Sequence, residues 1–343
     1  MTQQTWPNRL LLWFDTHKRT MPWRADKDNK VEPWQTWVSE VMLQQTTVAT
    51  VMPRYLEFME RWPSFNAFLQ ISEDEIYHFW QGLGYYSRAR NLYKGIQYIK
   101  SEYGGQLPQD LDKLKKIPGL GDYTAAAIAS IAFNQKAAAI DGNVARLFAR
   151  FWLMDDIGEK LKQKQRKQLL TYIPDRAGDF TQALIELGAL ICRPNQPQCT
   201  HCPIVSHCKA FNQGKVNNYP IKQVKKAKEI RYAQFYRVYN RQGEILFFKR
   251  PNQGLLASMY VLPSNNWYND DTSSIEDRLK NSLYNKALLY EYKHIFTHIE
   301  LRAKVYNVTM EHIIGWNDAY WVSRENLAQI ALPTVIKKAL KDL

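Results

Sequence analysis

The chain has 343 residues, of which 45% are hydrophobic, so it is long enough for two domains and can bury a sizeable core in each. Lysine and arginine number 46 against 33 acidic residues, and the formal net charge of +13 favours a polyanionic partner, nucleic acid first and an anionic membrane second. The sequence has no run of about 18 apolar residues, and residues 1–19 predict an amphipathic helix instead of a signal peptide. We therefore expect no transmembrane segment and a cytoplasmic protein, associated with the nucleoid if its source is bacterial.

Helical patterns dominate residues 1–210. One of these helices is opened by Pro33, which the first turn of a helix tolerates. Glu40 stands in it among apolar residues such as Trp37 and Val41. It is either a solvent-facing residue of an amphipathic helix or a buried acid. Burial would favour the protonated carboxyl that a general acid needs.

Further helices are predicted over residues 47–62, 72–80 and 87–103. The last two are separated by a glycine loop at 82–87 that contains two adjacent tyrosines. The loop is either a helix C-cap with packed tyrosines or a wedge on which bases stack, because every base has a π-face.

A helical hairpin is predicted around Pro-Gly-Leu-Gly at 118–121. Asp110 caps a short helix that Pro118 cannot continue, and a helix of small residues starts at Asp122. The turn is either a plain connection or a phosphate-binding site, because it exposes backbone N–H groups at a helix N-terminus. Asp141 opens another helical stretch, as an ordinary N-cap or as a second functional acid.

All four cysteines lie within 17 residues, at Cys192, Cys199, Cys202 and Cys208. Disulfides are disfavoured without a secretory signal, so four clustered thiols predict a metal site. Zinc and a [4Fe–4S] cluster both accept four thiolates. Zinc knuckles usually contain two C-x2-C pairs and this chain contains one, so we favour the iron–sulfur cluster.

The composition changes after residue 210. Residues 211–229 are polar and rich in lysine, which predicts a solvated linker whose charge would suit a phosphate backbone. From residue 230 hydrophobic residues alternate, which predicts a hairpin that turns at 241–243. A second alternating run covers 294–310, and a last strand at 318–323 precedes C-terminal helices. We expect a separate α+β domain over residues 230–343.

Five motifs together resemble the adenine DNA glycosylases of the helix-hairpin-helix, endonuclease III-like superfamily. They are WVSEVMLQQT around Glu40, GLGYYSRARNL at 82–92, IPGLGDYTAAAI at 117–128, IDGNVARL at 140–147 and the cysteine spacing. The resemblance implies a mainly α N-terminal region of two helical lobes, a [4Fe–4S] loop at 192–208 and an α+β, Nudix-like C-terminal domain. It also implies a monomeric, monofunctional glycosylase of base excision repair. Such an enzyme flips adenine out of double-stranded DNA, where it is mispaired with 8-oxoguanine or guanine, and hydrolyses its N-glycosidic bond.

The resemblance assigns the chemistry to four residues. Glu40 would protonate the leaving adenine, and Asp141 would stabilise the oxocarbenium-like sugar. Tyr123 and Asn143 would position these groups and the attacking water. Bifunctional relatives have a lysine at the position of Tyr123 and form a Schiff base, which tyrosine cannot do, so we expect little or no strand cleavage.

Other residues match the family's DNA-contacting positions. Contacts to the extruded adenine are expected from Arg19, Trp23, Leu43, Gln182 and Ile185. Contacts to the duplex are expected from Gln45 and Tyr85 as intercalating residues, Gly119 and Gly121 as the phosphate grip, and Phe296, Thr297 and His298 opposite the adenine.

Some features depart from the family pattern. Thr297 stands where serine is usual, Trp34 stands where tyrosine is common, and the loop at 25–32 is longer than usual. None of the glycines in the C-terminal domain is followed, six residues later, by the glutamate of a Nudix hydrolase box. We therefore expect recognition without nucleotide hydrolysis from this domain.

Two alternatives remain open. One is an endonuclease III-like lyase that acts on oxidised pyrimidines, against which Tyr123 argues. The other is a non-catalytic DNA-binding protein that uses its cluster as a redox sensor, against which the presence of both Glu40 and Asp141 argues.

Overall fold

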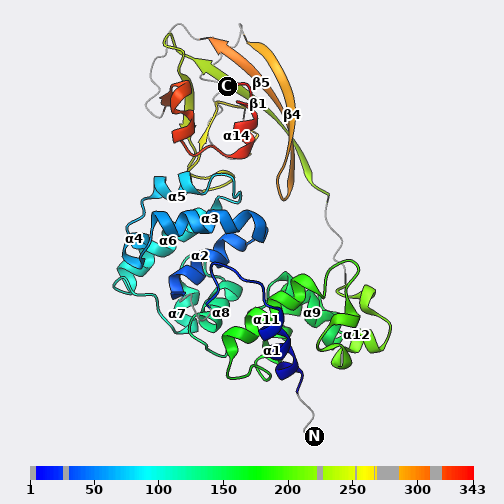
Figure 1. The fold of residues 1–343 in the computed structure, drawn as a ribbon. Coiled ribbons are helices and arrows are strands. Elements are labelled where there is room, and N and C mark those ends of the chain that lie inside the picture. The colour runs from blue at the N-terminus through cyan, green and yellow to red at the C-terminus, as the bar shows by residue number, and fades with distance from the viewer. Residues whose placement is uncertain are drawn as a thin grey trace. The chain divides into compact units, whose positions relative to one another are not determined.

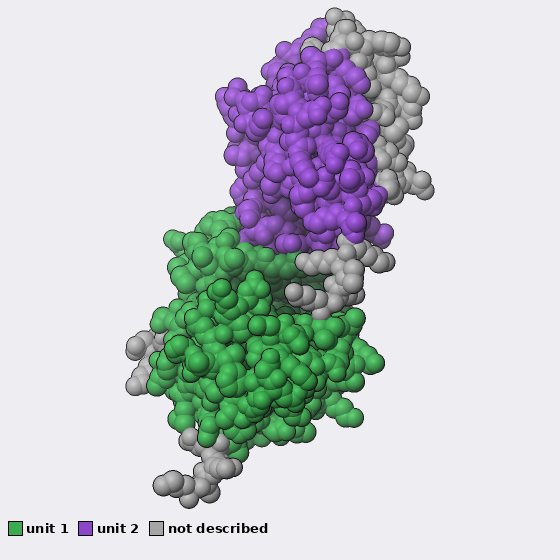
Figure 2. All heavy atoms as spheres, turned by 90° about the vertical axis from the view of Figure 1, so that its right-hand side faces the viewer, with its two compact units in different colours: residues 1–71, 91–224 green, residues 72–90, 225–343 purple. Residues whose placement is uncertain are grey.

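The computed structural model describes residues 5–25, 31–221, 227–251, 253–265, 267–268, 286–309 and 319–343. A helical N-terminal part precedes an α+β C-terminal part (Figure 1), so the predicted fold class is confirmed. The chain forms two compact units (Figure 2): unit 1 contains residues 1–71 and 91–224, and unit 2 contains residues 72–90 and 225–343. Residues 72–90, from the helical region, thus group with the C-terminal part.

Unit 1 is helical. Its elements are α1 (Trp6–His17), α2 (Pro33–Leu43), α3 (Val48–Arg61), α4 (Phe65–Leu69), α7 (Leu111–Lys116), α8 (Asp122–Ile131), α9 (Gly142–Trp152), α10 (Gly158–Leu169), α11 (Ala177–Leu190), α12 (Lys209–Asn212) and the 3-10 turns η1 (Cys199–His201), η2 (Val205–His207) and η3 (Val216–Asn218). Helix α6 (Ser87–Glu102) starts in unit 2 and continues in unit 1.

Local sequence signals set most helix starts. Pro33 is the first residue of α2, and Asp110 caps α7 by accepting a hydrogen bond from the Lys113 N–H at 2.9 Å. The helices expected over 47–62, 72–80 and 87–103 are present with slightly shorter bounds, whereas the short α4 was not predicted.

A hydrophobic core joins α1, α9 and α11. Leu10 and Phe14 of α1, Phe148 of α9 and Phe180 of α11 are all fully buried in it. Helix α8 can pack closely against α11 because Gly178 has no side chain. A Cβ there would lie only 2.9 Å from the Ser130 carbonyl oxygen. Helix α8 carries Tyr123 in its first turn, and Asp141 is the N-cap of α9.

Unit 2 contains α5 (Glu73–Phe79) and a mixed sheet. The strands are β1 (Glu229–Tyr239), β2 (Ile245–Lys249), β3 (Tyr260–Val261), β4 (Ala287–Ile295), β5 (Ile299–Thr309) and β6 (Ala319–Val322), followed by η5 (Arg324–Gln329) and α14 (Thr334–Lys338). Their order is β3-β2-β1-β5-β4, with β6 also paired to β2. Strands β1 and β5 run parallel and the other pairs run antiparallel.

The prediction of one continuous run over 294–310 is wrong in its middle. Strand β4 ends at Ile295 and β5 begins at Ile299, because the chain reverses in a tight turn between them. The Phe296 N–H donates to the Ile299 carbonyl oxygen at 2.8 Å, which closes this turn. Most of β4 was not predicted at all. The predicted first hairpin and last strand are confirmed as β1–β2 and β6, although residues 310 and 318 lie outside the described residues.

No helix among the described residues is long and apolar enough to cross a membrane. Five residues of the predicted linker, 222–226, lie outside the described part, as do residues 26–30 of the longer loop.

Candidate active site and thiol pocket

Glu40 is buried in the last turns of α2, with 7% of its surface exposed, so the solvent-facing interpretation is wrong. The Tyr123 hydroxyl, from α8, donates a hydrogen bond to Glu40 Oε2 at 2.7 Å. Burial raises the pKa of Glu40 to about 7, and the nearby Asp141 carboxyl adds to the rise while the Tyr123 hydrogen bond opposes it. Near neutral pH, a substantial fraction of Glu40 is therefore protonated.

Asp141 is the N-cap of α9. Its Oδ1 accepts a hydrogen bond from the Val144 N–H at 2.7 Å, and its Oδ2 accepts one from Asn143 Nδ2 at 3.2 Å. Asn143 is held in place because Gly188 of α11 packs against it so closely that a Cβ there would lie 2.9 Å from Asn143 Cβ. Burial raises the pKa of Asp141 despite these hydrogen bonds.

Glu40, Asp141 and Tyr123 lie close enough to affect one another's pKa. The Asp141 charge raises the pKa of Glu40, and both carboxyls raise the pKa of Tyr123, after burial as the main cause. Tyr123 therefore remains a neutral hydrogen-bond donor over the physiological pH range. Side chains a hundred residues apart in sequence are thus gathered into one cluster of two carboxyls, a phenol and an amide.

A buried ion-pair network joins two of the residues expected around the adenine. Arg19 Nη2 pairs with Glu186 Oε2 at 2.6 Å, and Arg24 Nη1 pairs with Glu186 Oε1 at 2.9 Å. Arg24 Nε also donates to Gln182 Oε1 at 2.8 Å. The sequence reasoning missed Arg24 and Glu186. The available signal for Glu186 was an acid within the otherwise apolar residues 183–190 of α11.

The other three members of this set are partly buried in unit 1. Trp23 packs edge-to-face on Tyr55, with ring centroids 5.3 Å apart. Leu43 is the last residue of α2 and is half-buried, and Ile185 packs against the hydrophobic core from α11.

The two hairpin glycines differ in what the backbone requires. Gly119 has a φ of +86°, and a Cβ there would lie 2.8 Å from Asn91 Cβ, so only glycine fits. Gly121 is the N-cap of α8 with an ordinary φ of −70°, and a Cβ there would meet nothing within 4 Å. Its missing side chain leaves the first turn of α8 open. Asp122 follows, paired with Lys115 at 3.8 Å and Arg166 at 3.3 Å.

Both residues expected to intercalate have a left-handed backbone and an exposed side chain. Gln45 in unit 1 has a φ of 58°, and Tyr85 in unit 2 has a φ of 47°. Non-glycine residues rarely adopt this conformation, and it concentrates at functional positions. The Tyr85 loop is fixed from behind by buried Arg88, whose Nη2 donates to the carbonyl oxygens of Leu83 at 2.8 Å and Gly84 at 3.1 Å.

The turn at 296–298 forms the tip of the β4–β5 hairpin. Thr297 and His298 are exposed there, whereas Phe296 stacks on Trp267 with ring centroids 6.0 Å apart. Lys228, the residue before β1, holds the tip of the hairpin: its Nζ donates to the Phe296 carbonyl oxygen at 2.8 Å.

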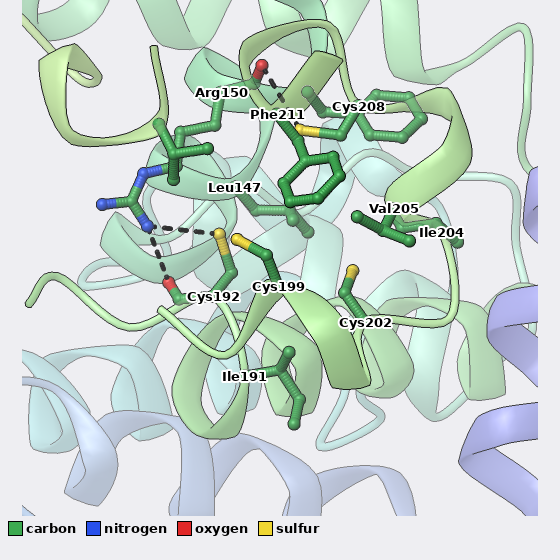
Figure 3. A pocket seen from close by; sticks show the side chains of 12 residues that line it. Leu147, Arg150, Ile191, Cys192, Cys199, Cys202, Ile204, Val205, Cys208 and Phe211 are labelled. Carbon is green, nitrogen blue, oxygen red and sulfur yellow. Dashed lines mark hydrogen bonds between the residues drawn. The ribbon is translucent and has the colours of Figure 1, made fainter. Parts of the chain in front are cut away.

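The four cysteines line one pocket of unit 1, and Figure 3 shows their thiols around it. None of them forms a disulfide. Arg150 Nη1 donates to Cys192 Sγ at 3.4 Å. The rest of the lining is mostly apolar and consists of Leu147, Arg150, Phe151, Ile191, Ile204, Val205, Phe211 and Val216.

The donor set of this pocket fits a group bound by four thiolates. Its lining contains no histidine or carboxylate. Burial raises the pKa of the Cys202 thiol to about 12, so a bound cation would be needed to hold the thiolate form. Among the described residues, no group of three or more histidine, cysteine, aspartate or glutamate side chains is arranged to hold a metal ion.

Comparison with known proteins identifies both parts of the chain. Residues 38–174 match the model of the HhH-GPD superfamily base excision DNA repair proteins, and residues 235–342 match that of the NUDIX domain. A thermostable thymine-DNA glycosylase of known structure aligns with a TM-score of 0.53 and 26% identity, over 60% of this chain and 95% of that chain.

Two relatives match almost the whole chain. It is 32% identical to the human adenine DNA glycosylase over 407 residues, covering 97% of this chain and 72% of the human protein. It is also 32% identical to the adenine DNA glycosylase of Buchnera aphidicola subsp. Baizongia pistaciae over 350 residues, covering 100% of this chain and 98% of that protein. The chain therefore belongs to the adenine DNA glycosylase family of the HhH-GPD superfamily, with a C-terminal NUDIX domain.

Proposed function

We propose that this enzyme hydrolyses the N-glycosidic bond of adenine mispaired with 8-oxoguanine or guanine in duplex DNA, without cutting the strand. One observation carries the proposal: a glutamate buried in unit 1, with a pKa near 7, shares its surroundings with a second buried carboxyl. Glycoside cleavage uses such a pair when one group is protonated and the other is ionised.

Glu40 is the general acid in this mechanism. Neutral adenine is a poor leaving group, because it would depart with a negative charge. A proton delivered from Glu40 to a ring nitrogen removes that charge while the bond from the base to C1′ lengthens. The Tyr123 hydroxyl at 2.7 Å holds the carboxyl in one orientation for this transfer.

Asp141 is the electrostatic partner. Burial raises the pKa of Asp141, but the hydrogen bonds from Val144 and Asn143 oppose this rise because they favour the ionised form. The negative charge stabilises the positive sugar that develops as the base departs. Asn143, hydrogen bonded to Asp141 at 3.2 Å, positions the attacking water together with Tyr123. A phenol cannot form a Schiff base at C1′, so the reaction ends with an abasic site.

Base flipping brings the adenine to these groups, at a cost of roughly a few kcal/mol for unstacking. The wall of the adenine pocket is formed by Arg19, Trp23, Leu43, Gln182 and Ile185. The ion pairs of Arg19 and Arg24 with Glu186 fix the polar part of that wall.

Duplex contacts surround the flipped base. Gln45 and Tyr85 fill the gap, and backbone N–H groups at Gly119 and Gly121 bind a phosphate. Phe296, Thr297 and His298 read the base opposite the adenine. Phosphate contacts of this kind make binding strongly dependent on salt. We further propose that the enzyme acts as a monomer inside the cell, with DNA and no membrane as its partner.

Cys192, Cys199, Cys202 and Cys208 would hold a [4Fe–4S] cluster. The four thiols line one pocket, as a group bound by four thiolates requires. Bound there, the cluster would supply redox-capable iron, and its four bonds to the cysteines would link the parts of residues 192–208. Arg150 Nη1 donates to Cys192 Sγ at 3.4 Å and would hold this cysteine in position as a ligand. Iron and acid-labile sulfide at about four each per chain, with absorbance near 400 nm, would support the cluster, and stoichiometric zinc would refute it.

A single-turnover assay tests the mechanism. Duplexes with adenine opposite 8-oxoguanine should release adenine without β-elimination, and duplexes with thymine glycol should remain intact. Glu40→Gln should abolish release, while Glu102→Gln, at an exposed position at the end of α6, should leave it unchanged. Full activity of Glu40→Gln would overturn the assignment of the acid. Strand cleavage by the unmodified chain would favour a lyase.

A further inference from the structure

Residues 72–90 precede the glycine hairpin at 118–121 in sequence but group with unit 2. This segment carries α5, the loop with Tyr85 and the first turn of α6. We propose that it ties the Tyr85 loop to the C-terminal region, with Gln81 and Tyr86 as positioning residues for Tyr85. The proposal rests on the proposed function in one respect, the role of Tyr85 as a wedge in DNA.

Side chains on both sides of Tyr85 bond to the C-terminal region. Gln81 Nε2 donates to the Ile330 carbonyl oxygen at 3.3 Å, and the Tyr86 hydroxyl donates to the Leu332 carbonyl oxygen at 3.3 Å. Both acceptors are main-chain oxygens in the segment between η5 and α14. The loop is thus held at its start and at its end by one stretch of backbone.

A second set of contacts holds the elements that flank the loop. Arg90 Nη1 donates to the Ala257 carbonyl oxygen at 3.4 Å, and Lys249 Nζ lies 3.5 Å from Asp74 Oδ1. The Ser258 hydroxyl is hydrogen bonded to the Tyr77 phenol of α5. Contacts therefore run from α5, from the loop and from the start of α6 to the C-terminal region.

The loop at 256–258, which these residues contact, has a strained backbone. Leu256 and Ser258 have φ values of 56° and 61°, and Ser258 is buried. Left-handed conformations at non-glycine residues persist where the surroundings impose them. Here the imposing surroundings include Tyr77 and Arg90, which contact Ser258 and Ala257.

Arg88 and Trp80, on either side of the loop, hold its backbone in place next to Tyr85. Trp80 Nε1 donates to the Gly84 carbonyl oxygen at 3.2 Å, beside the two Arg88 hydrogen bonds, and the Arg88 guanidinium lies 5.7 Å from the centroid of the Tyr85 ring. Tyr85 itself is 47% exposed. The wedge side chain is consequently free to meet DNA while its backbone is anchored to the unit that carries the base-reading hairpin. It follows that the identity of the opposite base can influence insertion of the wedge.

The test compares the full-length double variant Gln81→Leu/Tyr86→Phe with Tyr320→Phe, a matched change at an exposed tyrosine of β6. In DNA-free protein, hydrogen exchange of the amides at 82–85 should accelerate roughly tenfold in the double variant, the factor for two net hydrogen bonds of ordinary strength. Tyr320→Phe should cause no change. Equal exchange in the double variant and the unmodified chain would overturn the proposal.

A kinetic arm tests whether the tie acts through Tyr85. The ratio of single-turnover rates for adenine opposite 8-oxoguanine and opposite guanine should fall about three- to tenfold in the double variant. Added to Tyr85→Ala, the same two changes should cause no further fall, because residues acting through one group are non-additive. An additive fall would overturn the tie. If Tyr85→Ala alone left the ratio intact, the wedge role would fail, and hydrogen exchange would still decide whether the tie exists.

Discussion

Glu40 in unit 1 and the turn at 296–298 in unit 2 differ in their exposure to solvent. Glu40 is buried between helices and depends on low solvation for its pKa near 7. Thr297 and His298 lie exposed at the tip of a hairpin whose backbone is held by Lys228 and β1. Proton transfer needs a desolvated acid, whereas reading a base needs donors and acceptors that project from the protein. Changes in unit 1 should therefore alter the rate of chemistry, and changes in unit 2 should alter the choice of mispair.

After the loss of activity expected for Glu40→Gln, the next largest effect is expected for Asp141→Asn. Asparagine is as good an N-cap as aspartate, so α9 should keep its start while the site loses a negative charge. Turnover should fall about a thousandfold, in the range of a lost electrostatic contact to a developing charge, with little change in thermal unfolding. Asp110→Asn makes the same exchange at the cap of α7 and should alter neither property. A loss of less than about tenfold would contradict the proposed role of Asp141.

Turnover should depend on pH because Glu40 must be protonated. With a pKa of about 7, the protonated fraction falls tenfold for each pH unit above that value, and single-turnover rates should fall with it. A second decline is expected at acidic pH, where Asp141 gains a proton. A flat profile between pH 7 and 9 would contradict Glu40 as the acid.

Folding stability reports on the same group. The folded chain binds a proton at Glu40 below about pH 7, whereas the unfolded chain binds it only below about 4.5. The free energy of unfolding should therefore fall as pH rises through this window. The difference corresponds to roughly 3 kcal/mol above pH 7. In urea denaturation, the free energy of unfolding of Glu40→Gln should exceed that of the unmodified chain by an amount of that order at pH 8.5 and by little at pH 4. An equal difference at both pH values would refute this account.

The sequence predicted the grouping of Glu40, Asp141 and Tyr123 better than the residues around it. Glu40, Asp141 and Tyr123 stand in compact motifs whose caps and turns are local signals, so the starts of their helices follow from nearby residues. Arg24 and Glu186 depend on tertiary packing between segments more than 150 residues apart, which no local pattern encodes. Burial of Glu40 could be argued from its apolar neighbours, but only the packing of α2 against α8 decides it.

In unit 2 the missed strand β4 has a physical reason. Its register shifts between Leu288 and Tyr290 where it pairs with β5, and most of its side chains are exposed, so its sequence lacks clean alternation. The turn that joins β4 to β5 contains Thr297 and His298 without glycine or asparagine, so it carries no turn signal. The grouping of residues 72–90 with unit 2 depends on contacts across more than 150 residues of sequence and was equally invisible.

A smaller effect, confined to selectivity, is expected for Lys228→Met. The change removes the donor to the Phe296 carbonyl oxygen at 2.8 Å while keeping an apolar side chain of similar length. The preference for 8-oxoguanine over guanine opposite adenine should fall about three- to tenfold, the range for the net contribution of one ordinary hydrogen bond. Lys304→Met, which removes an exposed ion pair with Glu291, is the control. Equal loss on both mispairs would indicate weaker DNA binding instead of poorer reading.

The smallest effect is expected for Asp122→Asn in the glycine hairpin. Asp122 is half exposed in the first turn of α8, where it pairs with Lys115 and Arg166 and where its charge would repel the phosphate proposed to bind at Gly119 and Gly121. Removing this charge should tighten duplex binding about two- to fivefold at low salt, as for charges a few ångströms apart in solvent, and less at high salt. Asp112→Asn removes an exposed charge that is also near Lys115 but lies in the first turn of α7 instead of α8, and it should change little. Weaker binding by Asp122→Asn would mean that the hairpin does not contact phosphate.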